Sequence, residues 1–190
     1  AARVFASING INRIELDSSK PRLGIATSGK AYLDVMQALD DLGIDQDKAD
    51  NLGIRVYKIG MPWPLDPEVT FAFANHLEEI LVVEEKRSVI EDQLTSQLYN
   101  LGGAERPRII GEFDEFGDDL LPNTGELTPD LVAHAIQSRL EKLERVRNRS
   151  TSTKTSSSVE LFSPPCSSEA SLKRTPHFCS GCPHNTSTKV

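Results

Sequence analysis

The stretch ILVVEEKRSVIEDQL at residues 80–94 decides the fold, because it leads from a buried strand directly into a helix. Four successive apolar residues at 80–83 are typical of a strand covered on both faces of a parallel sheet. Ser88 and Glu91 then fit a capping box, which marks a helix start. Apolar side chains follow at helical spacing: Ile90, Leu94, Leu98 and Leu101. The stretch therefore predicts a strand over 80–85 and a helix from residue 88 to the glycines at 102 and 103.

The same alternation of strand and helix recurs on both sides of this stretch. Further strands are expected at 22–27, 54–59 and 108–111, and 13–17 is a candidate edge strand after a helical stretch that ends near Ile11. Further helices are expected at 32–42, at 66–77 and at 128–148. Such alternation is typical of βαβ units. The sequence therefore predicts an α/β fold, a three-layer, mostly parallel sheet with helices on both faces.

Composition limits the kinds of protein this chain can be. It has 190 residues, enough for one to one and a half domains, and no apolar run approaches the roughly 20 residues that cross a bilayer. A net charge of −7 argues against nucleic acid or an anionic membrane as the main partner. Three cysteines are an odd number, which excludes a full disulfide framework, and two of them form a C-x-x-C pair, which favours a reducing compartment. We expect a cytoplasmic protein.

The last forty residues differ in kind from the rest. Residues 150–171 contain nine Ser and three Thr, which is typical of a flexible linker. Residues 150–190 carry a net charge of +2. Since the whole chain carries −7, residues 1–149 carry −9. There is no initiator Met, and the last residue, Val190, follows a Cys/His cluster with no finishing element after it. We therefore expect an internal piece of a longer protein.

Ligands of parallel sheets bind at the carboxyl ends of the strands, so the loops there are candidate sites. These loops are TSGK (27–30), GMPWP (60–64), EEKRS (84–88) and GEFDEFG (111–117). The TSGK turn could hold an anion with its amides and Lys30. Gly24, Gly29 and Lys30 have the spacing of a phosphate-binding P-loop, but Ala31 lacks the hydroxyl that binds the metal. An ordinary tight turn between strand and helix is the competing interpretation.

Other candidates at these loops have a plain structural alternative. The four charges of 84–87 form either a solvated turn or an interface that a partner neutralises. Trp63, between two prolines, either docks a partner or covers the sheet edge. His76 and His134 have no neighbouring ligand pattern, so we expect surface or hydrogen-bonded histidines.

The sharpest chemical signal is the segment HFCSGCPHNTSTKV at 177–190. The two-residue gap lets the thiolates of Cys179 and Cys182 turn toward one metal centre. Three outcomes remain open: an iron–sulfur cluster that takes further cysteines from elsewhere, a zinc site completed by His177 or His184, or a redox dithiol. Composition alone does not choose among them.

Five stretches of the chain, in the same order, resemble the indolepyruvate ferredoxin oxidoreductase family in its large fused bacterial form. They are LGIATSGKAYLDVMQALDDLGI (23–44), GIRVYKIGMPWPLDPE (53–68), EEILVVEEKRSVIEDQL (78–94), RPRIIGEFDEFG (106–117) and FCSGCPHNTSTKV (178–190). The resemblance implies a thiamine diphosphate and Mg²⁺ enzyme that oxidatively decarboxylates an aryl 2-oxo acid such as indolepyruvate. It further implies acyl transfer to coenzyme A and electron transfer through [4Fe-4S] clusters to ferredoxin.

The resemblance also implies a division of the chain. Residues 20–149 are similar to the family's transketolase C-terminal-like domain, after a lead-in over 1–19. Residues 173–190 would begin the thiamine-diphosphate-binding domain, beyond a linker over 150–172. In the family the C-x-x-C pair binds a cluster, so Cys179 and Cys182 inherit that role, and His184 and Asn185 would lie near the thiamine cofactor.

The chain departs from the complete family pattern. It lacks the Gly-Asp-Gly motif that holds Mg²⁺ and diphosphate, and Cys166 is the one further cysteine, so this piece alone should be inactive. The whole enzyme is expected to be a homo-oligomer whose other domains contact this one. Two alternatives from other classes are a non-catalytic α/β docking module and a zinc-binding accessory protein that uses Cys179, Cys182 and His184.

Overall fold

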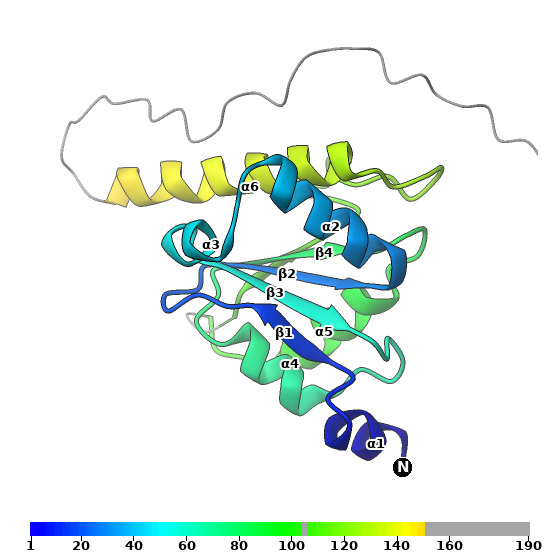
Figure 1. The fold of residues 1–190 in the computed structure, drawn as a ribbon. Coiled ribbons are helices and arrows are strands. Elements are labelled where there is room, and N and C mark those ends of the chain that lie inside the picture. Colours follow the sequence, from blue (N-terminus) through cyan, green and yellow to red (C-terminus); the bar gives the residue numbers. More distant parts are fainter. Residues whose placement is uncertain (104–105, 151–190) are drawn as a thin grey trace, which may run out of the picture.

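A five-stranded sheet with strand order β1-β3-β2-β4-β5 forms the centre of the fold (Figure 1). The computed structural model describes residues 1–103 and 106–150, with side chains up to residue 148. The strands are β1 (Arg13–Leu16), β2 (Leu23–Ser28), β3 (Ile54–Ile59), β4 (Glu79–Val83) and β5 (Arg108–Ile110). All neighbours pair in parallel except β1, which lies antiparallel to β3 at one edge. The predicted linker and the start of a second domain lie outside the described residues.

Helices cover both faces of this sheet and make three layers (Figure 1). The helices are α1 (Ala2–Ile8), α2 (Gly29–Asp41), α3 (Gln46–Leu52), α4 (Pro67–Ala74), α5 (Val89–Leu98) and α6 (Pro129–Ser150). One buried cluster joins the sheet to α2, α3 and α6, and a second joins it to α4 and α5. The predicted fold class, a mostly parallel α/β sheet with helices on both faces, is confirmed.

The strand that the sequence makes clearest is also the most buried. All five residues of β4 are buried, because β2 and β5 flank it and helices cover both its faces. Its side chains alternate between the two clusters: Leu81 and Val83 face the α2–α6 side, and Ile80 and Val82 face the α4–α5 side. Burial of such a side chain contributes about 1.5–3 kcal/mol, so β4 anchors both layers.

One helix was not predicted from the sequence. Helix α3 has seven residues, QDKADNL, and only Ala49 of them is buried. It is defined by its ends: the Asp45 side chain accepts a hydrogen bond from the Lys48 amide, and Gly53 follows with a φ of +77°. These are ordinary cap signals, but so short and polar a segment has no apolar stripe to reveal it.

A charged network joins α6 to the amino ends of β4 and β5. The Arg139 guanidinium donates to both carboxylate oxygens of Glu79, Nε to Oε1 at 2.7 Å and Nη2 to Oε2 at 2.6 Å, and both side chains are almost fully buried. Glu115 pairs with Arg139 at 3.0 Å and also with Arg108 and Lys142. Burial by itself raises the pKa of Glu115, but the hydrogen bond from Lys142 and the charge of Arg139 outweigh it and lower that pKa to about 2.

Gly24 is required for close packing of α4 on the sheet, and this predicts a stability effect. A Cβ at this position would lie 2.4 Å from Cδ1 of Leu77 and 2.7 Å from Cζ of Phe73. We expect Gly24→Ala to lower the free energy of unfolding by about 1–3 kcal/mol through overpacking. Gly102→Ala is the matched control, because a Cβ there meets open space. Urea unfolding of both variants measures the difference, and equal stabilities would contradict the packing role.

The Glu115 network predicts a specific dependence of stability on pH. The native pKa of Glu115 lies below the ordinary value of 4.5, so its ionised form stabilises the fold above about pH 4.5. This contribution is lost as the pH falls from 4.5 through 2. We expect Glu115→Gln to be less stable than the parent at pH 6 and to lose less stability on acidification. Urea unfolding at pH 6 and pH 3 tests this, with Asp40→Asn, which removes an exposed carboxylate, as control.

Candidate functional site

The sheet's topological switch point lies between β2 and β4. The chain leaves β2 toward β3 on one side, and β4 lies on the other side of β2. The connection after β2 carries α2 on one face, and the connection after β3 carries α4 on the other. Ligands of such sheets bind at the carboxyl edge at this point. The residues there are the TSGK turn after β2 and the EEKRS loop after β4.

Lys30, the cation of the TSGK turn, already pairs with acids of the same chain. The Lys30 ammonium donates to Asp34 at 2.9 Å and to the Leu127 carbonyl at 2.9 Å, and it lies 3.5 Å from Glu85 and 3.8 Å from Glu126. The hydrogen bond with Asp34 contributes most to raising the pKa of Lys30. Anion binding by Lys30 is therefore disfavoured, and 27–30 is the tight turn between strand and helix that was the alternative interpretation.

Glu84, which directly follows β4, caps the helix after it. Its carboxylate accepts hydrogen bonds from the Ile90 amide at 2.9 and 3.1 Å and from the Glu91 amide at 3.1 Å. These are the amides that an N-cap side chain would satisfy, and a negative charge also suits the helix dipole. The predicted capping box of Ser88 and Glu91 was wrong, since the Ser88 side chain makes no cap hydrogen bond. Glu84 was missed because its cap reaches across the loop and leaves no local motif.

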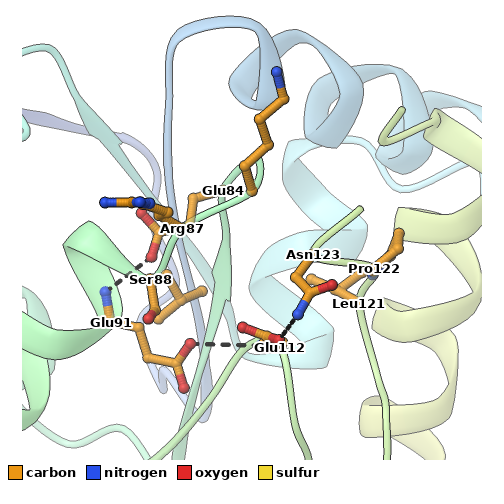
Figure 2. Close-up of a pocket in the computed structure, with 10 residues that line it drawn as sticks. Glu84, Arg87, Ser88, Glu91, Glu112, Leu121, Pro122 and Asn123 are labelled. Atoms are coloured by element: carbon orange, nitrogen blue, oxygen red, sulfur yellow. Dashed lines mark hydrogen bonds between the residues drawn. The ribbon is translucent and has the colours of Figure 1, made fainter. Parts of the chain in front are cut away.

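A small cavity lies beside this cap, between the ends of β4 and β5 (Figure 2). Its volume of about 20 Å³ suits roughly one water molecule. The Glu112 amide donates to Oε2 of Glu91 at 3.4 Å, and Asn123 donates to Glu112. Gly111 makes room for this arrangement, because a Cβ there would lie 2.4 Å from Oε2 of Glu91. The sequence placed Glu91 in a capping box and Glu112 in the candidate loop 111–117, but it gave no signal that the two would meet at a cavity.

Three carboxylates thus approach one another at the cavity. Burial is the main cause that raises the pKa of both Glu84 and Glu91, and the charges of Asp92 and Glu112 raise that of Glu91 further. Within residues 1–103 and 106–150 no set of three His, Cys, Asp or Glu side chains has the geometry to hold a metal ion. The cavity is also too small for a substrate or a nucleotide cofactor. Its groups hold the loops on either side of it in place.

The 111–117 loop does not stay at the carboxyl edge as expected. Its first two residues line the cavity, but the chain then turns at Asp114, whose side chain accepts from the amides of Phe116 and Asp118. Glu115 is thereby carried to the network of Arg108, Arg139 and Lys142. The second half of this loop therefore contacts α6 through the ion pairs of Glu115.

Of the two roles predicted for Trp63, the structure excludes covering the sheet edge and leaves partner docking open. Trp63 is 69% exposed, so it does not cover the sheet edge. Gln93 fixes the loop, because it donates to the Pro62 carbonyl and accepts from the Leu65 amide. His76 and His134 are both exposed, as expected for histidines without a ligand role.

The strongest predicted site residues cannot be placed. Cys179, Cys182, His184 and Asn185 lie outside the described residues, as do Cys166 and His177. Their roles in binding a cluster or a thiamine cofactor stay predictions.

Comparison with known proteins places this arrangement in a family. Residues 12–164 match the model of the indolepyruvate ferredoxin oxidoreductase middle domain. The chain belongs to this family. This match takes in the five strands and all helices except α1, so the cavity and the Lys30 cluster are features of a middle domain.

Curated relatives carry the same name over most of this chain. Indolepyruvate oxidoreductase subunit IorA of Thermococcus kodakarensis is 28% identical over 87% of the chain and 22% of its own length. IorA of Methanothermobacter marburgensis is 29% identical over 94% of the chain and 24% of its own length. The chain thus spans less than a quarter of the curated relatives that it matches.

Solved structures were also compared with this fold. A 2-oxoglutarate:ferredoxin oxidoreductase from Magnetococcus marinus aligns with a TM-score of 0.46 and 18% identity, over 68% of this chain and 19% of that one. An inactive split-gene transketolase β4 tetramer aligns with a TM-score of 0.46 and 21% identity, over 68% of this chain and 41% of that one.

Among the described residues, no helix is long and apolar enough to cross a membrane.

The Glu84 cap predicts a local effect on α5. We expect Glu84→Ala to lower the free energy of unfolding by about 1 kcal/mol, because two amides lose their acceptor. Exchange of the Ile90 and Glu91 amides should quicken about fivefold if the loss is felt as local opening. Glu84→Gln is the matched control, since its amide oxygen can still accept and the effect should be smaller. Unchanged amide exchange in Glu84→Ala would contradict the cap.

Proposed function

We propose that this chain is part of an indolepyruvate ferredoxin oxidoreductase. The match of residues 12–164 to the family's middle domain is the observation that carries the proposal. In the proposed reaction an aryl 2-oxo acid such as indolepyruvate loses carbon dioxide, and its acyl group is joined to the sulfur of coenzyme A. Two electrons leave the substrate, one for each of two ferredoxin molecules, and the thiol proton is released.

The cofactors proposed for the whole enzyme are thiamine diphosphate, Mg²⁺ and [4Fe-4S] clusters. When bound, thiamine diphosphate would supply the electron sink for decarboxylation, and the clusters would supply electron transfer. Cys179 and Cys182 fit the cluster by donor chemistry, because thiolates are the ligands that iron–sulfur clusters take. Two cysteines supply half of the four ligands, so the remainder would come from elsewhere. His184 and Asn185 are proposed to lie near the thiamine cofactor.

The domain of residues 20–149 is proposed to be a non-catalytic organiser of its neighbours. Two observations support this role. The Lys30 cation at the switch point is paired with Asp34, Glu85 and Glu126, and the cavity beside Glu84 has room for about one water molecule. The linker over 150–172 and a thiamine-binding domain from 173 complete the proposed arrangement. The expected lead-in over 1–19 contains β1, which pairs with β3, so the proposed domain takes in this strand.

Assay of the full-length protein tests the proposed function. The expected result is reduction of ferredoxin that requires both indolepyruvate and coenzyme A, together with bound iron and sulfide after anaerobic preparation. Stoichiometric zinc without iron would instead support the zinc-binding accessory protein. A protein that binds neither metal and reduces no ferredoxin would refute the oxidoreductase proposal.

The cluster assignment predicts the effect of one substitution in the full-length enzyme. Cys182→Ala should reduce ferredoxin reduction to background, because the cluster loses a ligand, while thiamine diphosphate binding changes little. Cys166→Ala, in the predicted linker, is the matched control and should keep its activity. Ferredoxin reduction and thiamine diphosphate affinity measure the two effects separately. Full activity of Cys182→Ala would show that this thiol is not a cluster ligand.

A further inference from the structure

The EEKRS loop uses its acids and cations differently. The Glu84 carboxylate turns inward to cap α5, and Glu85 pairs with Lys30. Lys86 and Arg87 are both exposed, and neither forms an ion pair with any described residue. The loop thus presents two positive charges at the carboxyl edge, although residues 1–149 carry a net charge of −9. The sequence alone left four balanced charges, and the structure separates them.

Apolar side chains lie at the same edge. Gln93 donates both to the Pro62 carbonyl at 2.7 Å and to the Val89 carbonyl at 2.8 Å, so it joins the Trp63 loop to the first turn of α5. Trp63 is 69% exposed and Val89 is 41% exposed. We name Trp63, Lys86, Arg87 and Val89 the carboxyl-edge surface. Exposed Trp and Arg together are typical of the residues that contribute most to protein interfaces.

We propose that the carboxyl-edge surface binds an acidic surface of another domain of the same polypeptide. This rests on the proposed function only in that the chain belongs to a longer enzyme. Charge complementarity decides the chemistry of the partner, since two unpaired cations in an acidic domain favour carboxylates. The relatives decide its source, because the chain spans less than a quarter of their length and the remainder needs contact surfaces.

The backbone of the loop holds these two cations in exposed positions at the rim of the small cavity beside Glu84. Lys86 has a φ of +69°, a left-handed conformation that non-glycine residues rarely adopt. The Arg87 amide donates to the Glu85 carbonyl, and the Val89 amide donates to the Arg87 carbonyl. Glu84 is held by α5 and Glu85 by Lys30. The turn that leads from these acids into α5 is therefore fixed in conformation, and so are the backbone positions of its two cations. A preformed turn loses little conformational entropy when it binds.

Zero-length carbodiimide cross-linking of the full-length enzyme tests the proposal, because it joins a lysine amine to a carboxylate in direct contact. We expect mass spectrometry to find Lys86 linked to an Asp or Glu outside residues 1–190. Lys86→Arg should remove this link. The link between Lys30 and Glu85, whose charged atoms lie 3.5 Å apart and come from separate elements, should persist in the variant and shows that the fold is intact.

A second measurement supports the proposal independently of any link. Lys86 should be acetylated at least tenfold more slowly in the full-length enzyme than in the 190-residue chain. Equal acetylation rates, or Lys86 links confined to residues 1–190, would overturn the proposal. Protection that arises only when ferredoxin is added would also overturn it, since a separate acidic protein would then be the occupant. None of these readouts needs catalysis, so failure of the proposed function would show separately, as absent ferredoxin reduction.

Discussion

The arrangement of this domain depends on the burial of β4 on both of its faces. A strand with five buried residues needs a helix layer on each side, and α6 completes the layer that α2 begins. The strand starts with a carboxylate, Glu79, that is only 1% exposed. A buried carboxylate is costly unless it is paired and hydrogen-bonded, and the bidentate contact from Arg139 meets both conditions. The position of α6 is therefore fixed by charge as well as by packing.

The parts of the fold that could be predicted are those that leave a repeated pattern. The apolar run of β4 and the stripe of α5 depend on burial, and burial constrains many neighbouring residues at once. Helix α3 was missed because its stability comes from its two ends. The Glu84 cap was missed for a related reason: its hydrogen bonds join residues six and seven positions apart, and the serine at the expected cap position concealed it.

The candidate site divides in the same way. The fold indicates where a ligand would bind, and the sequence identified the right loops, but neither shows whether a cation there is free. Lys30 and Lys86 are both lysines at the carboxyl edge of neighbouring strands. Lys30 lies among acids contributed by α2, by the loop after β4 and by residue 126, and these contacts depend on tertiary structure. Only the tertiary structure distinguishes a cation that stabilises the domain from one that is left for a partner.

Glu85 connects these two lysines, because it pairs with Lys30 and directly precedes Lys86 in the chain. This connection explains how the usual ligand position can be filled by internal ion pairs while the neighbouring loop still offers cations to a partner. Pairing of Glu85 with Lys30 joins the loop after β4 to the start of α2, while Glu84 joins it to α5. The loop is held at both acids, so the remaining residues must reverse direction over a short distance. A left-handed Lys86 accomplishes this reversal, at a cost of order 1 kcal/mol or more for a residue with a Cβ. The internal ion pairs that occupy the usual ligand position therefore also set the geometry in which Lys86 and Arg87 are exposed.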